Sequence, residues 1–128
     1  MGRAILGVVA GLAAWIIIVL AAGGLLRAAW PEYAAVAEAM TFTLAMKIAR
    51  LSIGAVATLA AGTVTAIVTR STVARVMPGA LLLLAFIPQH ISLWDKFPVW
   101  YHLTFLLSLV PLTLAGGRIA PHRQIPAQ

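Results

Sequence analysis

The feature that most constrains this chain is a run of nineteen uncharged residues, 51–69, with Arg50 before it and Arg70 after it. An α-helix rises about 1.5 Å per residue, so the chain between the two arginines covers roughly 30 Å, the thickness of the hydrocarbon core of a bilayer. The run therefore predicts a membrane-spanning helix over about residues 48–69, with cations at both ends.

The composition favours a membrane environment for the whole chain. The chain is 62% hydrophobic and 9% charged, whereas soluble domains carry about 25% charged residues. So few charges would not cover the surface of a water-soluble fold, and lipid supplies the missing apolar solvent. A length of 128 residues indicates one domain. The absence of cysteine excludes disulfides, thiolate metal sites and cysteine nucleophiles.

Three other segments have the same apolar character and are expected to span the membrane: residues 4–26, 76–93 and 99–115. The first is longer than the apolar core of a signal peptide, about 7–15 residues, so we expect it to be retained. Pro88 and Pro111 should bend the helices that contain them, and Gly116–Gly117 should end the last one. The predicted fold class is an all-α integral membrane protein, a four-helix transmembrane bundle with a flexible tail over 118–128.

The second predicted span has an ambiguous beginning. Pro31 and Glu32 are typical of the first turn of a helix, and no helix breaker follows before Lys47. The second helix can therefore extend back to residue 31, which is too long for the bilayer core. The extension would then project, bend along the surface or pack on another subunit, and its thin polar face favours packing.

The charges of the connections bear on orientation. Four spans place both termini on one side of the membrane. That side holds Arg3, Arg70, Arg75, Arg118 and Arg123, and the other side holds Arg27, Lys47, Arg50, Lys96 and all three acids. Five cations against four lean towards cytoplasmic termini, and we expect a bacterial cytoplasmic (inner) membrane. The net charge of +6 is spread without a basic cluster, which indicates contacts with lipid headgroups and not with nucleic acid.

Small residues recur at helical spacing in two of the predicted spans. Gly54, Thr58, Gly62 and Ala66 follow one another every four residues. We call this set the small-residue ridge, and it predicts close packing against the first helix or against another copy of the chain. Gly7 and Gly11 form a GxxxG pair on the first span, a weaker signal of the same kind.

Two histidines are predicted to face each other. A hairpin of the third and fourth spans that turns near Lys96 places His90 and His102 at the same depth. Two level imidazoles could bind a metal ion or a haem iron, with Asp95 or Glu38 as a further ligand. The alternative is a pair of interfacial histidines, one of them hydrogen-bonded to a backbone carbonyl.

Lys47 and Arg50 are three residues apart and share one helix face. They are candidates for an anion or lipid-headgroup clamp, or for ion pairs with Glu38 or Asp95. The simpler interpretation is that both cations snorkel to the headgroups. Asp95 is then part of a turn, and Glu38 lies on a solvated face.

The chain contains no recognisable nucleophile and base, phosphate loop or carboxylate pair, so we expect no enzymatic activity. Three hypotheses remain. The first is an accessory, assembly or interaction subunit that contacts another membrane protein or forms a homo-oligomer. The second is a small oligomeric transporter or channel with an outer polar vestibule of Lys47, Arg50, His90 and His102. The third is a metal- or haem-binding membrane protein that uses the two histidines.

Overall fold

The computed structural model describes residues 1–121, and these residues form helices and no strands. The elements are α1 (Gly2–Ala29), α2 (Pro31–Val36), α3 (Leu44–Val68), α4 (Thr72–Ser92), the 3-10 helix η1 (Trp94–Lys96) and α5 (Val99–Ile119). Helices α1, α3, α4 and α5 are long and apolar enough to cross a membrane. The predicted tail begins inside α5, and residues 122–128 lie outside the described part of the chain.

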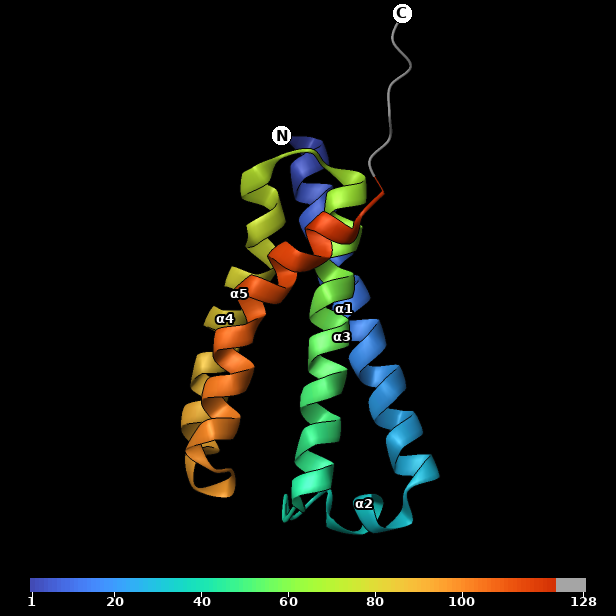
Figure 1. Cartoon of the computed structure of the whole chain (residues 1–128), viewed down its shortest axis with the longest axis vertical. Coiled ribbons are helices and arrows are strands. Elements are labelled where there is room, and N and C mark those ends of the chain that lie inside the picture. Colours follow the sequence, from blue (N-terminus) through green and yellow to red (C-terminus); the bar gives the residue numbers. More distant parts are fainter. Residues whose placement is uncertain (122–128) are drawn as a thin grey trace, which may run out of the picture.

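Helix α3 is the centre of the bundle. It makes its most extensive contacts with α1 and α5, while α4 packs chiefly on α5 (Figure 1). The start of α1, the α3–α4 connection and the end of α5 lie at one end of the molecule, which we call the terminal end. Helix α2 and η1 lie at the opposite end, which we call the loop end.

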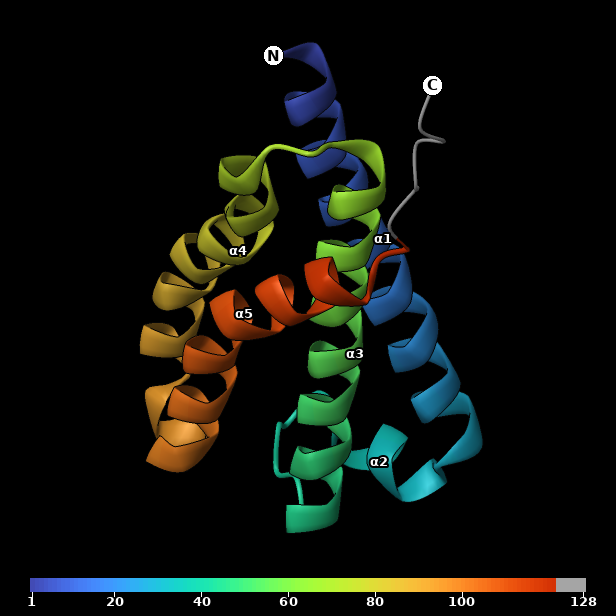
Figure 2. The ribbon, with the colours of Figure 1, turned by 45° about the horizontal axis from the view of Figure 1, so that its top comes forward.

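Helix α5 crosses α3 through glycine. It continues through Gly116 and Gly117 to Ile119, so the predicted end at residue 115 is wrong. The reason is the crossing itself. A Cβ atom added to Gly116 would collide with the carbonyl oxygen of Leu59 on α3, and one added to Gly62 would collide with the backbone of α5. Figure 2 shows the second half of α5, which contains Pro111, turning across α3.

The predicted extension of the second span is not continuous with it. Helix α2 ends at Val36, a turn follows, and α3 begins only at Leu44. Met40 has a φ of 56°, the left-handed conformation that reverses the chain direction here. Thr43 then caps α3, because its hydroxyl oxygen accepts the backbone N–H of Met46 at 3.3 Å. The segment therefore folds back onto its own bundle at the loop end.

Candidate functional site

Arg50, in the second turn of α3, is turned into the protein. Its Nη1 donates a hydrogen bond to the hydroxyl of Tyr33 at 2.7 Å, and its Nε donates to the hydroxyl of Tyr101 at 3.2 Å. Its Cζ atom lies 4.7 Å from the ring centroid of Phe42 and 5.9 Å from that of Phe97, within the range of a cation–π contact. Arg50 thus has specific partners within the protein, which the simpler prediction of snorkelling to the headgroups does not include.

The four rings around Arg50 form one stack, which we call the aromatic cage. Tyr33 stacks on Phe42 with centroids 5.1 Å apart, Phe42 on Phe97 at 5.9 Å, and Phe97 on Tyr101 at 4.3 Å. Tyr33 comes from α2, Phe42 from the loop before α3, Phe97 from the η1–α5 turn and Tyr101 from the first turn of α5. All four are buried. The cage thus requires the reversal of the chain at Met40.

A cavity of about 160 Å³ adjoins the cage. Arg50, Tyr33 and Tyr101 line it, and its remaining lining residues are apolar or aromatic ones of α1, α3, α4 and α5, with Trp15 among them. A guanidinium has five N–H donors in a planar fork. Two of them serve the phenols, so donors of Nη1 and Nη2 are left for a molecule in the cavity. The arrangement suits recognition of an anion that carries an apolar group.

His90 and His102 are in direct contact, as the hairpin register predicted. Their Nδ1 atoms are 2.7 Å apart, and the Nε2 of His102 lies 3.2 Å from the carbonyl oxygen of Trp94. A carbonyl oxygen only accepts, so His102 carries its proton on Nε2. Its Nδ1 is then the acceptor, and His90 donates from Nδ1. This contact leaves the Nε2 lone pair of His90 without a proton.

The pair does not have the geometry of a metal or haem site. Zinc–imidazole bonds of about 2.0–2.1 Å hold two ligand nitrogens roughly 3.3 Å apart at a tetrahedral angle, and the Nδ1 atoms of His90 and His102 are closer than that, at 2.7 Å. Two axial haem ligands would be still farther apart. Within residues 1–121, no group of three or more His, Asp or Glu side chains is placed to hold an ion. The predicted further ligands, Asp95 and Glu38, therefore do not join the histidines.

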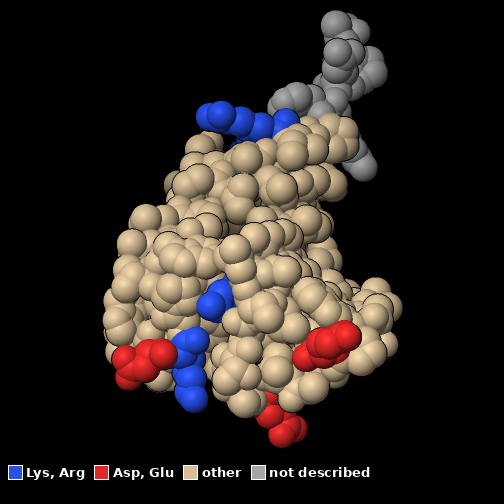
Figure 3. All heavy atoms as spheres, turned by 60° about the horizontal axis from the view of Figure 1, so that its bottom comes forward, with Lys and Arg blue, Asp and Glu red and all other residues tan. Residues whose placement is uncertain are grey.

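The remaining charged candidates are separate from Arg50. Glu38 and Asp95 are exposed and Lys47 is half-buried. Figure 3, which brings the loop end forward, shows acidic groups spread apart around that end. Among the described residues, no hydrogen bond or ion pair joins Arg50 to Glu38 or Asp95. The ion pairs predicted for Arg50 are thus replaced by contacts with aromatic groups.

The small-residue ridge packs inside the chain. Gly54 lies against the ring of Phe105, and Ala66 lies near Gly117, both on α5. Thr58 accepts a hydrogen bond at 3.2 Å from Nε1 of Trp15 on α1. With the Gly62 crossing, the ridge thus contacts both neighbours of α3.

The GxxxG pair of α1 also packs on α3. The hydroxyl of Thr65 donates to the carbonyl of Gly7 at 3.1 Å, and a Cβ atom added to Gly11 would collide with that hydroxyl. Both glycines are buried. The pair therefore serves the α1–α3 contact within one chain.

The residues of the cage were not identified as site residues from the sequence. Tyr33 and Tyr101 are of a residue type that is common at membrane interfaces, so neither stands out in the sequence as a site residue. The four-residue spacing of Phe97 and Tyr101 is a weak signal that the two rings lie close together. The contribution of Tyr33 and Phe42 depends on the loop conformation, which local sequence does not reveal.

Comparison of the chain with protein-family models, with curated proteins and with solved structures finds no match.

Proposed function

We propose that this protein is a non-catalytic, multi-pass membrane protein that binds an amphipathic anion at Arg50. The ligand would carry one carboxylate or phosphate on an apolar tail, as a fatty acid does. This is a narrower form of the transporter hypothesis, in which the outer vestibule is a binding site. The observation that carries it is the inward-facing Arg50, whose hydrogen-bond partners are two phenols and not a carboxylate.

An anion is expected at Arg50 because an uncompensated ionic group in a membrane has a high free energy. A charged side chain within a spanning helix is costly, and it is normally paired or faces a water-filled cavity. Phenol and phenyl groups stabilise the guanidinium by hydrogen bonds and by their ring faces, but they leave its net charge uncompensated. An anion in the adjoining cavity would supply the missing charge and accept the free N–H donors of Arg50.

The shape of the site agrees with an amphiphile. The cavity of about 160 Å³ is smaller than the sites of drug-sized ligands, which measure about 300–1,000 Å³. It accommodates a headgroup and the first part of a chain, while the rest of an apolar tail would extend along the exposed helix surfaces. Its apolar walls, which include Trp15 and Phe105, suit such a tail better than a hydrated inorganic ion.

The accessory-subunit hypothesis rested on the lack of a catalytic set, on the small-residue ridge and on the extension before the second span, and the last two are accounted for within the chain. The small-residue ridge packs on α1 and α5, and the segment before α3 supplies Tyr33 and Phe42 to the aromatic cage. Neither feature therefore requires a partner protein. A cytoplasmic-membrane location with cytoplasmic termini remains our expectation from the distribution of cations.

The test measures binding of radiolabelled dodecanoate, with dodecanol as the uncharged analogue, to protein in phosphatidylcholine nanodiscs. We expect dodecanoate to bind more tightly than dodecanol, and Arg50→Gln to weaken dodecanoate binding roughly ten- to hundredfold. The reason is the loss of charged hydrogen bonds worth about 1.5–3 kcal/mol. Arg50→Lys, which keeps the charge but not the planar fork, should have an intermediate affinity.

The matched control is Arg27→Gln, which removes an exposed arginine in the last turn of α1. Its affinity for dodecanoate should equal that of the unaltered protein. Equal binding of dodecanoate and dodecanol, or unchanged binding by Arg50→Gln, would show that Arg50 does not recognise an anion.

A further inference from the structure

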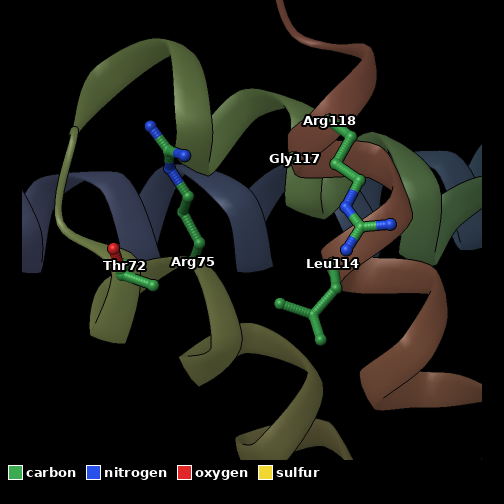
Figure 4. Close-up of a pocket in the computed structure, with 5 residues that line it drawn as sticks. All are labelled: Thr72, Arg75, Leu114, Gly117 and Arg118. Carbon is green, nitrogen blue, oxygen red and sulfur yellow. The ribbon is translucent and has the colours of Figure 1, made fainter.

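A second cavity, of about 270 Å³, lies at the terminal end of the molecule. Thr72 and Arg75 line it from the first turns of α4, and Leu114, Gly117 and Arg118 line it from the last turns of α5. Figure 4 shows the side chains of Arg75 and Arg118 extending from these two helices on different sides of the space between them. The cavity is separate from the one at Arg50, and the two share no lining residue.

The lining of this cavity is positively charged and contains no acid. Its charged members are Arg75 and Arg118, whereas Glu32, Glu38 and Asp95 belong to α2, the turn after it and η1, at the loop end. Two arginines that line one cavity repel each other, and an anion in the cavity would reduce that repulsion. The electrostatic field of the cavity therefore favours a negatively charged occupant.

A buried donor supports the same conclusion. Among residues 1–121, the Nε atom of Arg75 is buried and has no hydrogen-bond partner. Buried polar atoms of native proteins are nearly always paired, so an orphaned guanidinium nitrogen beside a cavity indicates a missing acceptor. Arg75 as a whole residue is half-buried, and it lines the cavity.

We propose that this cavity binds the phosphate group of an anionic phospholipid between Arg75 and Arg118. Arginine forks match the oxygens of phosphate, and the Thr72 hydroxyl is a further donor at the cavity wall. The cavity lies where α4 begins and α5 ends, the depth at which headgroups meet spanning helices. Leu114, which is exposed, offers an apolar surface to the acyl chains.

Gly117 keeps this space open. A Cβ atom placed on it would lie 3.8 Å from Cδ of Arg75 and 3.8 Å from Cβ of Ala66, both ordinary contacts, so a longer side chain would compete for space with these two groups. The glycine thus permits a headgroup-sized ligand to approach the backbone of α5.

The test is native mass spectrometry of the full-length protein with phosphatidylglycerol, phosphatidylcholine or diacylglycerol added in a mild detergent. We expect phosphatidylglycerol to be retained in preference to the other two lipids. Arg118→Gln, which alters an exposed side chain, should reduce that retention about tenfold, and Arg75→Gln combined with it should abolish the preference. The control Arg3→Gln removes an exposed charge at the same end that does not line the cavity, and it should retain the lipid normally.

Addition of inorganic phosphate distinguishes a lipid headgroup from free phosphate as the ligand of this cavity. Displacement of the lipid by inorganic phosphate alone would show that the phosphate group suffices, and free phosphate would then be the ligand. Resistance to displacement would show that the acyl chains contribute and that the lipid is the ligand. Equal retention of all three lipids, or an equal loss in Arg3→Gln and Arg118→Gln, would overturn the proposal. The two cavities share no lining residue, so this proposal is judged by Arg118→Gln against Arg3→Gln, and the site at Arg50 by Arg50→Gln against Arg27→Gln. Either proposal can therefore fail without the other.

Discussion

His102 and Arg50, which pack at the loop end, have an imidazole, a backbone carbonyl, phenols and ring faces as partners, and no carboxylate. His102 has no exposed surface, yet both ring nitrogens have partners, and its ring stacks on Trp94 with centroids 4.7 Å apart. Arg50 is held in the same manner by phenols and ring faces. Removal of one such partner would leave a buried polar group without a hydrogen bond, which lowers the stability of the fold.

His102→Leu tests this dependence. The substitution leaves the carbonyl of Trp94 and the Nδ1 donor of His90 without partners, so it should lower the free energy of unfolding by about 1–3 kcal/mol per unpaired group. Thermal unfolding in detergent measures the change. Gln89→Leu, an exposed position on the same helix as His90, is the control and should have little effect. Equal stability of the two variants would mean that the histidine contact contributes nothing.

At the residue scale, the sequence predicted the contact between His90 and His102 because both lie on regular helices joined by a short turn. Helical register then sets their depth. It did not predict that Arg50 turns inward, because this depends on Tyr33 and Phe42. Their positions follow from one left-handed residue, Met40, and that conformation has no signature in a methionine.

At the scale of elements, α3 is packed by backbone contact on both sides. Gly62 and Gly116 bring α3 and α5 together, while Gly7 and Gly11 bring α1 onto α3. The four long helices were predictable because uncharged runs of this length have few alternatives in a membrane. The break between α2 and α3 was not predictable, because residues 34–46 favour a helix locally. The reversal of the chain there is stabilised by a contact of Phe42 with Phe97, far along the chain.

Gly62→Ala and Gly24→Ala form a matched pair of element-scale variants. A Cβ atom on Gly62 collides with Thr113, so overpacking should cost about 1–3 kcal/mol of stability. A Cβ atom on Gly24 of α1 meets nothing within 4 Å, so the same substitution there should be neutral or stabilising by up to about 1 kcal/mol. Gly62→Leu should be more disruptive still.

Unfolding midpoints in one detergent compare these variants directly. If Gly62→Ala were as stable as Gly24→Ala, the close crossing of α3 and α5 would be refuted. Loss of stability in both variants would instead point to a general requirement for glycine in these helices.

At the scale of the whole molecule, the two ends differ in charge. The acids Glu32, Glu38 and Asp95 belong to the loop end, and the cavity lined by Arg75 and Arg118 belongs to the terminal end. Four apolar helices separate the ends. If these helices span a bilayer, the two ends face different compartments, and each of the proposed ligands reaches its site from its own leaflet.

Single-cysteine labelling tests this arrangement, since the chain has no cysteine of its own. Gly2→Cys and Lys96→Cys place exposed thiols at the terminal and loop ends. A membrane-impermeant maleimide added to intact cells or spheroplasts should label Lys96→Cys alone, and disruption of the membrane should make both accessible. Labelling of both thiols from one side would contradict the four-span topology.

Because α3 and α5 cross through glycine, the contact between these two helices is more rigid at the crossing than at the loop end. Where Gly62 meets Thr113, backbone touches backbone, and nothing there can yield by a change of rotamer. Around Arg50, α3 and α5 instead meet through side chains, as in the contact of Arg50 with Tyr101, and side chains have other rotamers. We therefore expect ligands with tails of different width to fit at the loop end without a change in the crossing of α3 and α5 at Gly62.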